Sequence, residues 1–339
     1  MEKEKLGYLS SLDLLRGLAA LAVCFFHFTH GNPDFLNNTN ILFQVGRYGF
    51  LGVDVFFVIS GFVIPYSMYR GRFSFGKIGL FLGKRFIRIE PPYILSIIMV
   101  VSLNWISTLS PYYKGAPFQI DSTALALHLG YLNAFFEFPW VNDVYWTLAI
   151  EFQYYILIAL IFPLLIHPKK WIAYLTLTIF GMLGFFITRH SLIFNYGFLF
   201  IVGILLFQFR IGYLEKSHFG AMLLIALLII FIKFDHRYLI AALLPYFFIT
   251  YFIFNDRISK FLGNISYSIY LIHIPIGGRI INLTETFIQN ELLRSLFVFV
   301  ALAVSIFAAW VFYRIIEKPS QELAKRINYN KKKIEPIKA

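Results

Sequence analysis

LDLLRGLAALAVCFFHF, at residues 12–28, is the stretch that decides the fold. Its apolar run predicts a membrane helix, and this helix carries two polar exceptions, Arg16 and His27. Eleven residues advance an α-helix by about 16 Å and roughly three turns, so both side chains project from one stripe at two depths. Because a cation and a titratable ring are costly inside a bilayer, the pair predicts a functional site that faces protein or a watery cavity.

The composition of the whole chain is that of a polytopic membrane protein. Of its 339 residues, 59% are hydrophobic and only 14% are charged, and the mean hydropathy is +0.70, which excludes an ordinary soluble domain. The first apolar segment is too long, and too polar at Arg16, for a removable signal peptide. Windows of about 20 apolar residues predict an all-α fold with about ten transmembrane helices, at residues 11–29, 48–69, 88–109, 144–166, 171–187, 191–209, 219–234, 238–255, 262–283 and 293–315.

The basic residues predict the orientation of these spans. With the N-terminus inside, 22 of the 30 Lys and Arg residues fall on the cytoplasmic side, seven fall outside and Arg16 lies within the first span. Since basic residues near span ends favour the cytoplasm, both termini are expected there. The net charge of +12 then reflects topology and needs no nucleic acid partner. The run at residues 331–333 reads as a tail near anionic lipid headgroups.

A second basic cluster precedes the third predicted span. Six basic residues lie between residues 70 and 88, and Glu90-Pro91-Pro92 is expected to open the helix, where proline is unstrained. Permanently charged guanidinium forks such as Arg85 and Arg88 suit phosphate groups. The alternative is that these basic residues only set the orientation of the neighbouring spans and contact lipid headgroups. The longest stretch without a predicted span, from about 110 to 143, falls outside. Its moderately apolar piece at residues 124–136 is too short to span, so a re-entrant or surface-lying segment is expected there.

Four titratable side chains are predicted to share the outer half of the bilayer. At 1.5 Å per residue, His27 lies about 5 Å below the outer surface, Asp54 about 9 Å, Glu151 about 10 Å and His273 about 13 to 15 Å. This depth pattern predicts a solvated pocket. Each residue also has a structural alternative, such as Arg16 reaching the cytoplasmic headgroups. Gly61 and Gly263 are expected to permit close helix packing.

Five motifs in order resemble the acyltransferase-3 family of bacterial membrane proteins. The N-terminal stretch pairs an arginine with a histidine eleven residues later, and the other four resemble its later signatures. They lie at residues 12–27, 56–62, 84–93, 146–151 and 262–275. The resemblance implies transfer of an acyl group, most often acetyl, from cytoplasmic acyl-coenzyme A (acyl-CoA) to a hydroxyl of a saccharide or lipid-linked glycan of the cell envelope. It also implies location in the bacterial plasma membrane, contact with lipids and no bound metal.

The resemblance points to Arg16, His27, Arg85, Arg88 and Glu151, and the chemistry of acyl transfer suggests a role for each. His27 is the expected proton acceptor for the attacking hydroxyl, with Glu151 or Asp54 orienting its ring. Arg16 steadies the thioester arm or the developing oxyanion. Arg85 and Arg88, with Lys84 and Ser60, form the expected acyl-CoA site.

The chain is expected to be a standalone member of the family. Residues 1–320 would form the transmembrane domain and residues 321–339 a basic cytoplasmic tail, without the esterase-like SGNH domain that many members carry. That arrangement favours decoration of capsule, exopolysaccharide or O-antigen. The alternative is a transporter or flippase of a saccharide or lipid-linked precursor, to which intramembrane charges and the sequence Pro275-Ile276-Gly277-Gly278 are also suited. Detection of a product heavier by one acyl group would distinguish the acyltransferase from the transporter or flippase. The sequence alone does not identify the acceptor.

Overall fold

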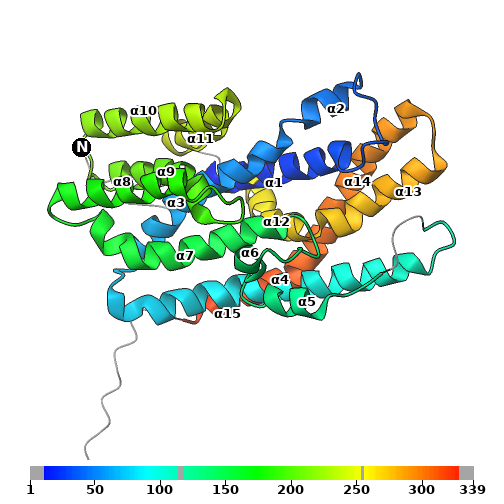
Figure 1. The fold of residues 1–339 in the computed structure, drawn as a ribbon, viewed down its shortest axis with the longest axis horizontal. Coiled ribbons are helices and arrows are strands. Elements are labelled where there is room, and N and C mark those ends of the chain that lie inside the picture. Colours follow the sequence, from blue (N-terminus) through cyan, green and yellow to red (C-terminus); the bar gives the residue numbers. More distant parts are fainter. Residues whose placement is uncertain (1–10, 114–117, 253–255, 328–339) are drawn as a thin grey trace, which may run out of the picture.

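A computed structural model describes residues 11–113, 118–252 and 256–327, and every regular element in these ranges is helical. The helices lie side by side, many of them roughly along the long axis of the molecule (Figure 1). Their bounds are α1 Ser11–His30, α2 Ile41–Gly46, α3 Gly52–Arg70, α4 Ile78–Thr108, α5 Ser122–His128, α6 Asn133–Phe136, α7 Tyr145–Leu165, α8 Lys170–Phe186, α9 Gly197–Arg210, α10 Lys216–Lys233, α11 His236–Tyr251, α12 Arg257–His273, α13 Arg279–Phe287, α14 Glu291–Phe312 and α15 Lys318–Lys325. Three 3₁₀ turns (Gly49–Leu51, Phe75–Lys77 and Ile193–Tyr196) and two π turns (Ile274–Gly278 and Tyr313–Glu317) extend or join them.

Helices long and apolar enough to cross a membrane account for much of the chain. Among the described residues there are seven such segments, at Ser11–His30, Ile41–Arg70, Phe75–Thr108, Tyr145–Leu165, Ile193–Arg210, Lys216–Lys233 and Glu291–Lys325. The other three predicted spans coincide with α8, α11 and α12, which have only 16 or 17 residues each. The all-α membrane class is confirmed, whereas the count of about ten and the cytoplasmic placement of both termini stay predictions.

Two of the boundaries predicted from the sequence fall inside continuous helices. The third span begins at Ile78, ten residues before its predicted start, so Pro91 and Pro92 lie inside α4 and do not open it. Proline removes an intrahelical hydrogen bond, but membrane helices tolerate it where neighbouring groups bind the backbone. The carbonyls that lose their helical partners are those of Ile87 and Arg88, four residues before each proline. Next to them, the hydroxyl of Tyr267 in α12 donates to the carbonyl of Ile89 at 2.9 Å and ties α12 to this part of α4. At the other end, α15 crosses the boundary expected at residue 320 and packs against α4, while the run at 331–333 lies outside the described residues.

The stretch between α4 and α7 folds into two short helices, α5 and α6. Asp121 caps α5 by accepting hydrogen bonds from the backbone amides of Thr123 and Ala124. The buried ring of His128 closes this segment: its Nδ1 donates to the Ala124 carbonyl at 2.6 Å and its Nε2 accepts from the Val141 amide at 3.2 Å. Both nitrogens of His128 are therefore satisfied.

Close helix contacts place α1 and α3 at the centre of the packing. A Cβ on Gly203 of α9 would lie 2.7 Å from the Cα of Gly61 in α3, and one on Gly263 of α12 would lie 2.6 Å from the Cα of Asp13 in α1. Any larger side chain would push these backbones apart. The expected packing role of Gly61 and Gly263 is confirmed: Gly61 allows α9 to pack closely on α3, and Gly263 brings α12 onto α1, the helix that carries Arg16 and His27 (Figure 1).

Candidate active site

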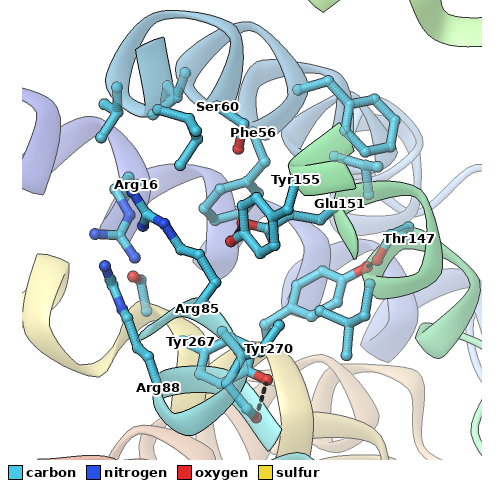
Figure 2. Close-up of a pocket in the computed structure, with 18 residues that line it drawn as sticks. Arg16, Phe56, Ser60, Arg85, Arg88, Thr147, Glu151, Tyr155, Tyr267 and Tyr270 are labelled. Carbon is cyan, nitrogen blue, oxygen red and sulfur yellow. Dashed lines mark hydrogen bonds between the residues drawn. The ribbon is translucent and has the colours of Figure 1, made fainter. Parts of the chain in front are cut away.

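One pocket in the described part of the chain gathers three arginines from two helices. Figure 2 shows the guanidinium groups of Arg16, Arg85 and Arg88 on one side of it, with Glu151 beside them. The pocket has an empty volume of about 950 Å³. We call it the arginine pocket; its polar lining residues are Arg16 of α1, Ser60 of α3, Arg85 and Arg88 of α4, Thr147, Glu151 and Tyr155 of α7, and Ser266, Tyr267 and Tyr270 of α12. The structure thus brings together five residues that the sequence placed in two separate groups.

Arg85 and Arg88 reach this pocket because α4 begins early. They are three residues apart on a helix, so they share a face. Arg85 is held by a hydrogen bond from Nη2 to the Ser67 hydroxyl at 2.9 Å. Its guanidinium carbon also lies 5.4 Å from the centre of the Tyr155 ring, within cation–π range. Lys84, also expected to bind the donor, does not line the pocket.

Glu151 lines the arginine pocket and is not paired with His27. The hydroxyl of Tyr155, one turn further along α7, donates to its carboxylate. His27 lines a different pocket, so the predicted orienting pair of Glu151 and His27 is wrong. Asp54 is buried in α3 and lines neither pocket, so the expected cluster of four titratable groups is divided. The depth estimate ignored rotation about each helix axis, and rotation decides which neighbour a side chain meets.

The second pocket, here called the histidine pocket, has an empty volume of about 1050 Å³. Among the residues that line it are His27, Asn32, Asn104, Asn142, Asp143, Arg279 and Asn282. These side chains come from α1, α4, α13 and the connections after α1 and before α7. Its chemistry is therefore mainly that of neutral amides, with one acid, one arginine and one imidazole.

His27 lies against a second histidine. The ring centres of His27 and His273 are 5.2 Å apart, and His273 is fully buried at the end of α12. The Nδ1 of His273 lies 2.9 Å from the carbonyl of Tyr270 and 3.1 Å from that of Ile269. Carbonyls only accept, so Nδ1 is the protonated nitrogen and Nε2 is left as an acceptor. Within the described part of the chain this Nε2 has no hydrogen-bond partner, in contrast to that of His128.

The comparisons agree with this arrangement of motifs. A family model described as an acyltransferase domain matches residues 9–314, which include every site residue predicted from the sequence. The chain belongs to the acyltransferase-3 family. No solved structure matches it.

Two curated relatives of this acyltransferase-3 chain come from Staphylococcus aureus. The O-acetyltransferase OatA of strain NCTC 8325 is 29% identical over 195 residues, which cover 54% of this chain and 30% of that protein. A protein of strain COL with a provisional O-acetyltransferase name is 23% identical over 378 residues, which cover 96% of this chain and 59% of that protein. The chain therefore spans less than two thirds of the length of either relative.

Sequence reasoning missed some residues of the acyltransferase-3 pockets. Tyr155 was not singled out, although its spacing of four residues from Glu151 on a helix signals contact. Arg279 was considered only for its effect on orientation. No sequence signal joins it to His27, because the two meet only through the fold. Within the described ranges, no group of three or more His, Cys, Asp or Glu residues is placed to hold a metal ion.

Proposed function

We propose that this protein is a membrane O-acyltransferase that moves an acyl group, with acetyl the first candidate, from acyl-CoA to a hydroxyl of a cell-surface saccharide or a lipid-linked envelope precursor. The observation that carries the proposal is one helix with a residue in each of two pockets. Arg16 joins two further arginines in the arginine pocket, and His27 lines the histidine pocket. Membership of an acyltransferase family and the names of its relatives agree with this assignment.

The arginine pocket has the chemistry to hold the donor. Three guanidinium groups and one carboxylate line it, and the carboxylates of Glu317 and Asp13 act on Arg16 from outside the lining. The lining itself therefore carries more positive than negative charge, which suits an anionic ligand. Coenzyme A carries phosphate groups, for which the planar guanidinium fork is a good partner. Arg85 and Arg88 bind these phosphates in our proposal, on the cytoplasmic side of a bacterial plasma membrane. Lys84 adds to the positive field from the same helix.

His27 is the group that handles the proton. The hydroxyl oxygen of the acceptor forms a bond to the thioester carbonyl carbon and the carbon–sulfur bond breaks. His27 takes the hydroxyl proton and returns it to the leaving thiolate. The rings of His27 and His273 are neighbours, and the unprotonated Nε2 of His273 has no partner among the described residues. In our proposal a ring N–H of His27 donates to this nitrogen during the reaction, which holds the ring and leaves its other nitrogen free to act as the base.

Arg16 is then a donor-binding residue and not an oxyanion partner. It is about 16 Å from His27 along α1, and the two side chains line different pockets. The thioester arm of acyl-CoA therefore extends from the arginine pocket to His27, and Arg16 steadies the arm near its start.

The test is an assay of the purified full chain with labelled acetyl-CoA and envelope saccharide. The proposal predicts a product heavier by one acetyl group and the release of free coenzyme A. Movement of the saccharide across a vesicle membrane without that mass change would favour the transporter or flippase instead. Absence of both coenzyme A binding and acetyl release would contradict the proposal.

A further inference from the structure

Arg279 is a fixed cation in the wall of the histidine pocket. It is the first residue of α13, directly after the π turn at Ile274–Gly278. Its Nη2 donates to the side-chain oxygen of Asn104 at 2.6 Å and its Nη1 donates to the hydroxyl of Ser107, both in α4. These two bonds fix the plane of the guanidinium across the gap between α13 and α4.

Hydrogen bonds fix the guanidinium group of Arg279, but no carboxylate neutralises its charge. Both of its partners are neutral oxygens, and its buried Nε has no hydrogen-bond partner among the described residues. Other arginines here do meet carboxylates: Arg189 pairs with Glu137 at 2.8 Å and Arg237 with Asp235 at 2.5 Å. Asp143 lines the same pocket, but it is exposed and forms no ion pair with Arg279 within 4.0 Å. The pocket therefore presents an unpaired guanidinium.

The rest of the lining suits a polyhydroxylated ligand. Asn32, Asn142 and Asn282 line it with side-chain amides, and His27 lies in the same wall. Asn32 donates to the side-chain oxygen of Asn282 at 3.2 Å and Asn142 to the carbonyl of Leu271 at 3.4 Å. Amides pair with hydroxyl groups in both directions, whereas a guanidinium only donates and prefers carboxylate or phosphate oxygens.

We propose that the histidine pocket binds an anionic acceptor, whose carboxylate or phosphate pairs with Arg279 while a neighbouring hydroxyl is presented to His27. This inference rests on the proposed acyl transfer and specifies its substrate. Two sources supply the same chemistry: an acidic sugar such as a uronic acid, and the phosphate of a lipid-linked glycan. Arg279 acts as a specificity-determining residue, since it selects the acceptor without taking part in proton transfer.

The experiment compares three acceptors in the acetyl-transfer assay: a neutral oligosaccharide, a uronic-acid oligosaccharide of matched length and a phosphorylated oligosaccharide. Arg279→Gln should raise KM for whichever charged acceptor is the substrate by about 10- to 100-fold, because a charge-assisted contact is lost. It should leave kcat and the KM for the neutral acceptor nearly unchanged. Arg279→Lys should fall between wild type and Arg279→Gln, because a point charge replaces the bidentate fork. The identity of the affected acceptor distinguishes the two sources.

Arg294→Gln is the matched control. Arg294 also donates to neutral oxygens, the carbonyls of Ile288 and Asp34 at 2.6 and 2.7 Å, but it does not line the histidine pocket. The Arg294→Gln variant should keep the wild-type ratio between the KM for the charged acceptor and the KM for the neutral acceptor. Equal changes for neutral and charged acceptors in Arg279→Gln, or no change, would overturn the inference and leave Arg279 as a tie between α13 and α4.

A direct binding measurement distinguishes a failure of this inference from a failure of the proposed function. Titration of the purified wild-type chain with the charged oligosaccharides, without acetyl-CoA, should give a Kd that Arg279→Gln weakens by the same factor. If wild type transfers no acetyl group but still binds the charged ligand through Arg279, then acyl transfer fails and the anion site stands. If transfer occurs and charged and neutral ligands bind equally to both proteins, the anion site fails.

Discussion

The two pockets differ in what they can do, although α1 contributes to both. The arginine pocket holds three guanidinium groups and one carboxylate, a set suited to fixing an anionic ligand. The histidine pocket holds amides, one unpaired arginine and a histidine whose neighbour is a second histidine. Binding of the donor and movement of the proton are therefore assigned to separate places along one helix. Substitutions in one pocket should change affinity for the donor, and substitutions in the other should change turnover or use of the acceptor.

The largest effect is expected from His27→Ala. Loss of a general base should lower kcat for acetyl transfer by about 10²- to 10⁴-fold. The affinity for coenzyme A should stay within about twofold, measured by titration of the purified protein, because His27 does not line the arginine pocket. His30→Ala is the control: it lies one turn further along α1, stacks on Phe43 and lines neither pocket. Wild-type turnover in His27→Ala would remove His27 from the mechanism.

The complementary change is the double substitution Arg85→Gln and Arg88→Gln. Without these guanidinium groups, the Kd for coenzyme A should rise by about 10- to 100-fold, since hydrogen bonds to charged groups are among the stronger ones. At saturating donor, kcat should remain close to that of wild type. Arg257→Gln removes a cation that lies outside both pockets and should change neither value. An unchanged coenzyme A affinity in the double variant would reassign the basic cluster to lipid contact.

A smaller effect is expected at His273, which is argued to act through His27. His273→Leu should lower kcat by about tenfold, the value of the one orienting hydrogen bond to His27 that the proposed reaction requires, with KM for acetyl-CoA unchanged. His273→Gln keeps an acceptor oxygen and should recover part of this loss. His128→Leu removes a buried histidine whose two nitrogens are already satisfied, so it should affect folding without a selective loss of kcat. Equal activity of the Leu and Gln variants would argue that His273 only packs.

The smallest effect on chemistry is expected where the helices merely pack. A Cβ at residue 203 would lie 2.1 Å from the Val58 carbonyl oxygen, so Gly203→Ala should destabilise the fold by about 1–3 kcal/mol. Thermal unfolding in detergent measures this, and activity per folded molecule should stay within about twofold. Gly220→Ala is the control, because nothing lies within 4 Å of the position its Cβ would take. A specific loss of donor affinity in Gly203→Ala would mean that the contact between α3 and α9 shapes the arginine pocket.

The sequence predicts well what depends on neighbouring residues. The apolar run at residues 12–28 places Arg16 and His27 on one helix, as found in α1. Pro91 and Pro92 misled the prediction, since proline favours the start of a helix in soluble proteins, whereas membrane helices also tolerate it in their interior. The contacts of His273 and Arg279 with distant parts of the chain, and the pocket that Glu151 lines, could not be predicted. Depth follows from counting residues, whereas the facing neighbour depends on how the helices rotate and pack.

The most direct measurement is photo-crosslinking of the purified chain with an acyl-CoA analogue that carries a diazirine in its acyl chain, with the attachment site read by mass spectrometry. If the donor extends from the arginine pocket to His27, the label attaches to residues that line the histidine pocket, and the double substitution at Arg85 and Arg88 reduces the labelling. Attachment confined to the lining of the arginine pocket would contradict this, because the thioester would then never reach His27.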